Sequence, residues 1–244
     1  MDIRFDGRRA LVTGAGKGIG YELAKALAAG GAETFALSRT QADLDQLKAE
    51  NPDIRTVCVD LADWAATRKA VEELGPIHLL VNNAAVLHCT TFMEIEEAEI
   101  KNTFDVNVHA VVNVSQVVAQ GMIARGKGGA IVNMSSIGGR VALENVPSYC
   151  ASKGAIEMLT KVMTRELGQH QIRINNVNPT VVMTAMGKKL WSDPAKSEPM
   201  MKRTPQRKFA EVKDVVHAVM FLLSDQSDMI NGASLFVDGG VTAV

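Results

Sequence analysis

Cysteine is scarce in this sequence of 244 residues, and its scarcity excludes two kinds of site. The three cysteines, Cys58, Cys89 and Cys150, are odd in number and far apart, so the chain offers neither a disulfide framework nor a C-x-x-C metal or redox motif. The five histidines show no metal-ligand spacing such as H-E-x-x-H. We therefore expect reduced thiols and no metal site.

An excess of one charge and long hydrophobic runs are also absent. Lysine and arginine number 26 and aspartate and glutamate 27, and this formal net charge of -1 argues against nucleic acid or an anionic membrane as a partner. No apolar run approaches the length that spans a bilayer, and the opening MDIRFDGRR lacks the apolar core of a secretory signal. We expect a cytoplasmic protein without a membrane segment, whose partner is a small molecule.

What the sequence does contain is an alternation of short apolar runs with longer segments of helical period. RRALVT, ETFALS and RTVCVDL predict three strands, with helices in IGYELAKALAAGG and QADLDQLKAE between them. The alternation continues through WAATRKAVEEL, IHLLVNN, a long helical stretch around 96 to 125, AIVNMSS, IRINNVNP and SLFVDGG. We predict an α/β protein whose residues 1–244 form a single-domain Rossmann fold, with a doubly wound seven-stranded parallel sheet and helices on both faces.

One stretch in the second half of the chain has a different character. PTVVMTAMGKKLWSDPAKSEPMMKRTP, between Pro179 and Pro205, carries four prolines and many lysines and methionines. Its periodicity is weak, which is typical of a mobile surface insertion. We interpret residues of about 180–205 as a lid over the substrate.

A glycine-rich turn follows the first predicted strand and leads into a helix. It reads Thr13-Gly14-Ala15-Gly16-Lys17-Gly18-Ile19-Gly20, so its spacing differs from the literal G-x-G-x-x-G. Glycines let the backbone approach a pyrophosphate, and the helix N-terminus presents free N–H groups to it. The strand and helix on either side favour a dinucleotide site over the alternative of tight packing alone.

The end of the second strand indicates which dinucleotide binds. An NAD-binding protein would place an acidic residue there to hold the ribose 2′-hydroxyl, whereas this strand ends in Leu37-Ser38-Arg39-Thr40. Arg39 could pair with a 2′-phosphate, and Lys17 adds a second positive charge. NADP(H) is the predicted cofactor, unless both cations are ordinary solvated charges. Asp60 and Asn82-Asn83-Ala84-Ala85, after the next strands, are further cofactor contacts or else helix caps.

A tyrosine and a lysine four residues apart are the predicted catalytic pair. Tyr149 and Lys153 would project from one face of a helix, where the ammonium would lower the pKa of the phenol. Ser136 ends the fifth strand at the same sheet edge. Asn107 lies within a helical stretch, where an amide needs a reason to be present.

Taken together, these motifs resemble the short-chain dehydrogenase/reductase family over nearly the whole chain. The resemblance rests on Thr13-Gly14-x-x-x-Gly18-x-Gly20, Asp60, Asn82-Asn83-Ala84, Asn107, Ser136, Tyr149-x-x-x-Lys153 and Asn178-Pro179. It implies that Tyr149 donates a proton to a carbonyl oxygen, Ser136 hydrogen-bonds that oxygen, Lys153 holds the nicotinamide ribose, and Asn107 anchors a proton-relay water. It also implies a homotetramer and these cofactor contacts: Gly14, Lys17, Gly18, Ile19, Gly20, Ser38, Arg39, Thr40, Asp60, Leu61, Asn83, Ala84, Tyr149, Lys153, Pro179, Val182 and Thr184.

The substrate prediction depends on the loop from Ile137 to Val146. The segments SRTQADLD, NPTVVMT and WSDP resemble NADPH-dependent reductases of α-dicarbonyls and ketoses in this family. Sugar-reducing relatives place polar side chains in this loop, whereas Ile137, Leu143 and Val146 cannot hydrogen-bond sugar hydroxyls. With Ser136, Tyr149 and Trp191 of the lid, these residues predict a carbonyl reductase that prefers α-dicarbonyls to ketoses such as L-xylulose. The alternatives are an NADP-dependent dehydrogenase of secondary or steroid-like alcohols and a non-catalytic NADP-binding protein.

Overall fold

Seven parallel strands form a single sheet in the computed structural model, which describes residues 3–184, 187–188 and 191–244. The strand order is β3-β2-β1-β4-β5-β6-β7, so the direction of winding reverses between β1 and β4. The predicted doubly wound seven-stranded sheet is confirmed. The strands are β1 Arg9–Thr13, β2 Glu33–Ser38, β3 Arg55–Cys58, β4 Leu79–Asn82, β5 Gly129–Met134, β6 Ile172–Pro179 and β7 Ser234–Val237.

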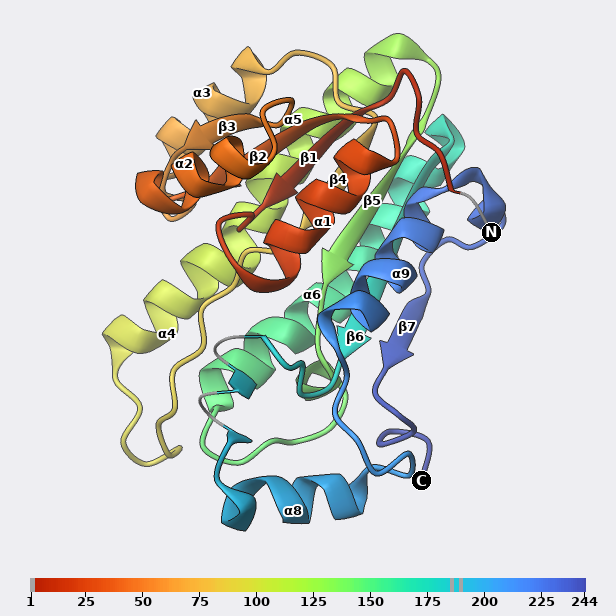
Figure 1. Ribbon diagram of the computed structural model, residues 1–244. Helices are drawn as coiled ribbons and strands as arrows, with labels where there is room; N and C mark the ends of the chain where they lie inside the picture. Colours follow the sequence, from red (N-terminus) through yellow and green to blue (C-terminus); the bar gives the residue numbers. More distant parts are fainter. Residues whose placement is uncertain (1–2, 185–186, 189–190) are drawn as a thin grey trace.

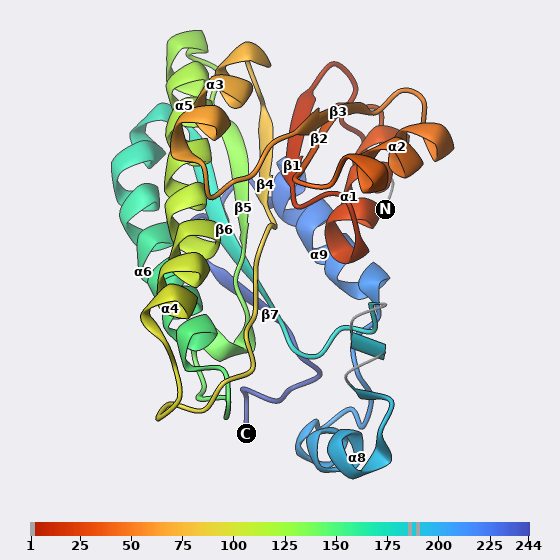
Figure 2. The same ribbon diagram turned by 90° about the vertical axis from the view of Figure 1, so that its left-hand side faces the viewer.

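Helices cover both faces of this sheet (Figure 2). On one face lie α1 Gly18–Ala29, α2 Gln41–Glu50 and α9 Val212–Leu223, which enclose one apolar cluster with the sheet. On the other face lie α3 Trp64–Glu73, α5 Ala110–Arg125 and α6 Pro147–Leu167, which enclose a second cluster. Every residue of β4, β5 and β6 except Gly129 is buried, as expected for strands covered on both faces. Within the described residues, no helix is both long and apolar enough to span a bilayer.

The predicted long helix around 96 to 125 is interrupted in the structure. Its parts are α4 Glu97–Phe104, a π-helical segment Asp105–His109 and α5. A π-helical turn contains one more residue than an α-helical turn, and such turns occur often at functional sites. Short 3₁₀ segments are also present, at Ile137–Gly139, Gly168–His170 and Asp225–Ser227.

The predicted lid contains a helix that weak periodicity did not indicate. This helix, α8 Pro194–Arg203, begins with a proline in its first turn and with the Asp193 side chain accepting a hydrogen bond from Ala195 N at 3.0 Å. It lies beyond the carboxyl ends of the strands (Figure 1). Near the start of the predicted lid, Met183 N donates to Ala210 O at 2.9 Å. Residues 185–186 and 189–190 of the predicted lid lie outside the described residues.

Candidate active site

The glycine-rich turn packs so closely on the end of β4 that side chains are excluded from it. A Cβ on Gly14, whose φ is +64°, would lie 2.7 Å from the Cα of Ala84. A Cβ on Gly20 would lie 2.4 Å from Nδ2 of Asn83, which donates to the carbonyl oxygens of Thr13 and Gly14 at 3.0 and 3.2 Å. Gly20 and Asn83 therefore shape the turn through contacts within the protein, and their predicted contact with the cofactor stays a prediction.

The N-terminus of α1 is suited to an anion. The helix begins at Gly18, and the residue before it, Lys17, has an extended backbone and makes no side-chain cap. The first turn of α1 contains no acidic residue. No carboxylate of the helix's own first turn therefore competes for its free N–H groups and the positive end of its dipole, an arrangement that suits phosphate.

A pocket of about 400 Å³ opens beside this turn. Most of the predicted cofactor contacts line it: Gly14, Lys17, Gly18, Ile19, Ser38, Arg39, Asp60, Leu61, Asn83, Ala84 and Thr184. Gly20, Thr40, Pro179, Val182, Tyr149 and Lys153 are not among its lining residues. Ala85, from the Asn82–Ala85 segment offered as a further contact, lines it too. Three lining residues were missed, Val59, Val86 and Val106, because an isolated apolar side chain carries no separate signal for ligand contact.

The two cations of this pocket differ in their surroundings. Lys17 Nζ lies 3.2 Å from Oδ1 of Asp43, a residue in the first turn of α2. Within the described part of the chain, the guanidinium of Arg39 has no hydrogen bond or ion pair to another side chain, and the residue is exposed. Arg39 is therefore available to a 2′-phosphate, whereas Lys17 is shared with Asp43. The sequence did not predict this partner of Lys17.

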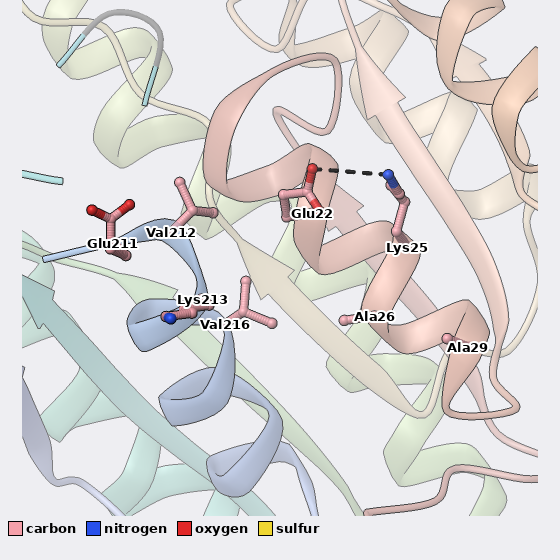
Figure 3. Close-up of a pocket in the computed structure, with 8 residues that line it drawn as sticks. All are labelled: Glu22, Lys25, Ala26, Ala29, Glu211, Val212, Lys213 and Val216. Atoms are coloured by element: carbon pink, nitrogen blue, oxygen red, sulfur yellow. Dashed lines mark ion pairs between the residues drawn. The ribbon is translucent and has the colours of Figure 1, made fainter. Parts of the chain in front are cut away.

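A larger cavity, of about 770 Å³, lies between α1 and α9 (Figure 3). Ala26, Ala29, Val212 and Val216 form its apolar part, and charged side chains stand around them, with the Glu22 carboxylate 3.9 Å from the Lys25 ammonium. It contains none of the predicted site residues. The predicted cofactor contacts are therefore gathered at the pocket beside the glycine turn and not at this cavity.

Lys153 is buried next to Tyr149 on α6. Its side chain donates to the carbonyl oxygen of Met134 at 2.7 Å, and only 3% of the residue is exposed. The ammonium lies 5.5 Å from the centre of the Tyr149 ring. Burial lowers the pKa of Lys153 to about 8, because the interior disfavours the charged form.

Ser136 connects the end of β5 to the tyrosine. Its hydroxyl oxygen accepts a hydrogen bond from Gly138 N at 3.0 Å and so caps the 3₁₀ turn Ile137–Gly139. Burial raises the pKa of Tyr149, and a side-chain hydrogen bond with Ser136 opposes that rise. The sequence predicted a lowered pKa for Tyr149, whereas in this structure the pKa is raised, because removal of water from the phenol is the largest effect.

Asn107 lies in the π-helical segment, and its side chain is fully engaged with the protein. Oδ1 accepts from Val86 N at 2.8 Å, while Nδ2 donates to Val86 O and to Ser152 Oγ, each at 3.0 Å. The Ser152 hydroxyl donates in turn to the carbonyl oxygen of Tyr149 at 2.7 Å. Asn107 thus ties a pocket-lining residue to the helix of Tyr149. A relay water at Asn107 stays a prediction, and the sequence missed Ser152.

The predicted apolar substrate wall is smaller than the sequence indicated. Ile137 and Val146 are 2% and 8% exposed, so of the three apolar loop residues only Leu143 is partly exposed. Trp191 is half-buried and packs edge-on against Phe209, with ring centres 5.6 Å apart. Among the described residues, no group of histidine, cysteine and carboxylate side chains could hold a metal ion.

Comparison with known proteins gives consistent matches over the chain. A sequence profile described as short chain dehydrogenase matches residues 8–195. The L-xylulose reductase of Mesocricetus auratus is 58% identical over 240 residues, 98% of each chain. Carbonyl reductase (NADPH) 2 of Sus scrofa is 51% identical over 243 residues, and the match covers 100% of both chains. A crystal structure of a gluconate 5-dehydrogenase from Burkholderia cenocepacia, in complex with NADP and tartrate, superposes with a TM-score of 0.94 at 37% identity, over 100% of this chain and 98% of that one.

Proposed function

Because this chain belongs to the short chain dehydrogenase family, we propose that it is an NADPH-dependent reductase of small α-dicarbonyls and ketoses. It is an oxidoreductase that acts on C=O and CH–OH groups. The observation that carries the proposal is the meeting of Ser136, Tyr149 and Lys153 where β5 ends and α6 begins.

The residues beside the glycine turn fit NADP(H). Bound NADPH supplies a hydride to the carbonyl carbon. The turn and the N-terminus of α1 suit the pyrophosphate, and Arg39 suits the 2′-phosphate. An ammonium has three hydrogens, and Met134 O takes one from Lys153, which leaves two for the hydroxyls of a ribose.

The protonation state of Tyr149 suits carbonyl reduction. Its raised pKa keeps the proton on the phenol at neutral pH, so Tyr149 can donate that proton to the carbonyl oxygen while Ser136 hydrogen-bonds the same oxygen. The names of the similar proteins, L-xylulose reductase and carbonyl reductase (NADPH) 2, also describe reduction. We therefore place carbonyl reduction ahead of the alternative alcohol dehydrogenase activity.

For the substrate, we propose that diacetyl-like dicarbonyls react more efficiently than L-xylulose. Leu143 and Trp191 offer apolar contact, and each sugar hydroxyl buried without a partner costs about 1 to 3 kcal/mol. The exposed polar residues Glu144 and Asn145 stand in the same loop and could bind a sugar instead. The names of the relatives include both L-xylulose reductase and carbonyl reductase, so the quantity to measure is the kcat/KM for a dicarbonyl relative to that for L-xylulose.

The test is a substrate panel with the purified full chain. We would follow oxidation of NADPH, and of NADH in parallel, with diacetyl, an aromatic diketone and L-xylulose, and reduction of NADP⁺ with secondary alcohols. The proposal expects NADPH oxidation with the carbonyls, and the highest kcat/KM with a dicarbonyl. NADPH binding without turnover of any carbonyl would instead identify a non-catalytic binder, and higher kcat/KM with alcohols at neutral pH would identify a dehydrogenase.

We also propose that the chain is one cytoplasmic domain with a substrate lid at about 180–205, and that it assembles as a homotetramer. Met158 and Val162 support an assembly, because both are apolar, lie one helical turn apart on α6 and are 59% and 45% exposed. Light scattering coupled to gel filtration would measure the mass. A monomer at micromolar concentration would contradict the tetramer.

A further inference from the structure

Four polar side chains recur along one stripe of α6. Tyr149, Lys153, Glu157 and Thr160 follow each other at helical spacing, so they share one face of the helix. The first two belong to the proposed catalytic group. Glu157 and Thr160 continue the stripe into the interior and are 6% and 0% exposed. A buried carboxylate is rare in proteins unless its oxygens have partners, so Glu157 calls for an explanation.

Both carboxylate oxygens of Glu157 are occupied by hydrogen-bond donors. Oε1 accepts from Nδ2 of Asn178 at 2.8 Å and from Nδ2 of Asn176 at 3.2 Å. Oε2 accepts from the hydroxyl of Ser234 at 2.6 Å. Within the described part of the chain no lysine or arginine forms a salt bridge with Glu157. The carboxylate is thus held by neutral donors, and it acts as a fixed acceptor.

Asn178 transmits the position of this acceptor to the site. Its amide is fully buried, and Nδ2 donates one hydrogen to Glu157 and the other to the carbonyl oxygen of Ser136 at 3.1 Å. Its Oδ1 has no partner among the described residues. A flipped amide would place Oδ1 against both oxygen acceptors, which is repulsive, so Glu157 and the carbonyl oxygen of Ser136 together determine which way Asn178 faces.

Ser136 is the residue at which these hydrogen bonds reach the proposed catalytic group. Its carbonyl oxygen accepts from Asn178 and from Gly139 N at 3.0 Å, and its hydroxyl oxygen accepts from Gly138 N. These bonds fix both the peptide and the side chain of the residue that hydrogen-bonds Tyr149. We propose that Glu157 is a positioning residue for carbonyl reduction, which holds Ser136 in place through the amide of Asn178. This inference rests on the proposed reductase function.

The same row supplies a matched control. Thr160 Oγ1 donates to Oδ1 of Asn176 at 2.6 Å and accepts from Nδ2 of Asn133 at 2.8 Å. It is as deeply buried as Glu157 and belongs to the same network, but none of its hydrogen bonds within the described residues involves Asn178 or Ser136. Loss of Thr160 hydrogen bonds therefore tests the effect of a weakened network without release of Ser136.

The experiment compares Glu157→Met, Glu157→Gln and Thr160→Val with the wild type in the full chain. We would measure the melting temperature, the Kd for NADPH, and kcat with diacetyl per NADPH-binding site. Glu157→Met is similar in length but offers no oxygen acceptor, so we expect kcat to fall about tenfold or more with the Kd for NADPH within about twofold. Glu157→Gln keeps a carbonyl oxygen for Asn178 and can donate to Ser234, so kcat should stay within about threefold. Thr160→Val should lower the melting temperature and leave kcat within about twofold.

Two results would overturn the proposal. One is a Glu157→Met enzyme with kcat within twofold of wild type, and the other is a Thr160→Val enzyme that loses as much kcat as Glu157→Met. If Glu157→Met does not fold, Glu157→Asp tests the proposal instead. Its side chain is one methylene shorter, so the carboxylate lies farther from Asn178 and kcat should fall at least threefold. If the wild type itself reduces no carbonyl, the proposed function fails, and crystal structures of the variants then test the positioning role of Glu157 without an activity assay. In Glu157→Met, Asn178 Nδ2 should lie more than about 3.5 Å from Ser136 O, whereas in Thr160→Val this hydrogen bond should remain.

Discussion

Replacing Lys153 with methionine should change how stability depends on pH as well as remove activity. The ammonium of Lys153 is buried, and its pKa falls from 10.5 to about 8. A base whose pKa is lower in the folded state binds fewer protons when folded, so between pH 8 and 10.5 the unfolded chain holds more protons than the folded one. By linkage, the stability of the wild type gains from rising pH in this window.

The magnitude follows from the size of the pKa change. A difference of about 2.5 units corresponds to about 3 kcal/mol at 1.36 kcal/mol per unit, of which about 2 to 3 kcal/mol is regained between pH 7 and pH 10. Lys153→Met has no such cost at pH 7, although it leaves Met134 O without its donor, at about 1 to 3 kcal/mol. The two effects oppose each other at pH 7, so the change with pH is the sharper quantity.

The assay is urea unfolding of both proteins at pH 7, 8, 9 and 10. Subtracting the free energies of unfolding cancels the other titrating groups, and we expect the wild type to gain about 2 to 3 kcal/mol relative to Lys153→Met between pH 7 and pH 10. Lys153→Gln serves as a control, because it is also neutral and should give the same pH dependence. A difference that stays flat within about 1 kcal/mol would refute a buried ammonium with a lowered pKa.

Other expectations concern the chemistry and the cofactor. Tyr149→Phe should lower kcat about a hundredfold or more with an NADPH Kd within twofold of wild type, and a tenth of wild-type turnover would contradict its role as proton donor. Arg39→Asp should move the NADPH to NADH ratio of kcat/KM about a hundredfold toward NADH, because about 2 kcal/mol of phosphate pairing is lost and a 2′-hydroxyl acceptor is gained. Lys17→Ala should move that ratio less than about fivefold, because the Lys17 side chain is 79% exposed and already paired with Asp43. Asp43→Asn, which removes this partner of Lys17, is the control. An effect of Lys17→Ala as large as that of Arg39→Asp would contradict this ranking. Trp191→Ala should raise KM for an aromatic diketone more than for diacetyl, and equal increases would remove Trp191 from the substrate site.

The sheet, and the candidate cofactor pocket beside the glycine turn, could be predicted because their signals are local. Buried parallel strands read as continuous apolar runs, and β4, β5 and β6 are buried almost throughout. A glycine turn between a strand and a helix has few other uses, and the pocket opens beside it. The spacing of Tyr149 and Lys153 places both on one face whatever the rest of the fold does.

Other features could not be predicted because they depend on contacts distant in sequence. The pKa of Tyr149 rises because of burial, which the spacing to Lys153 does not reveal. Asp43 reaches Lys17 only once α2 packs beside the glycine turn, and Asn178 reaches Ser136 only across two paired strands. Helix α8 was missed for a different reason. Asp193 and Pro194 are a good helix start, but the weak periodicity of the residues that follow predicts a loop.

The π-helical segment makes the register of the site depend on a single residue of chain length. An α-helix turns by about 100° per residue, so deletion of one residue within Asp105–His109 would restore a continuous α-helix and turn α4 about a third of a revolution against α5. Asn107 would then face away from Val86 and Ser152 although its own identity was unchanged. In a comparison of sequences, a gap of one residue in this segment is therefore a stronger warning of altered chemistry than many substitutions on the surface of α5.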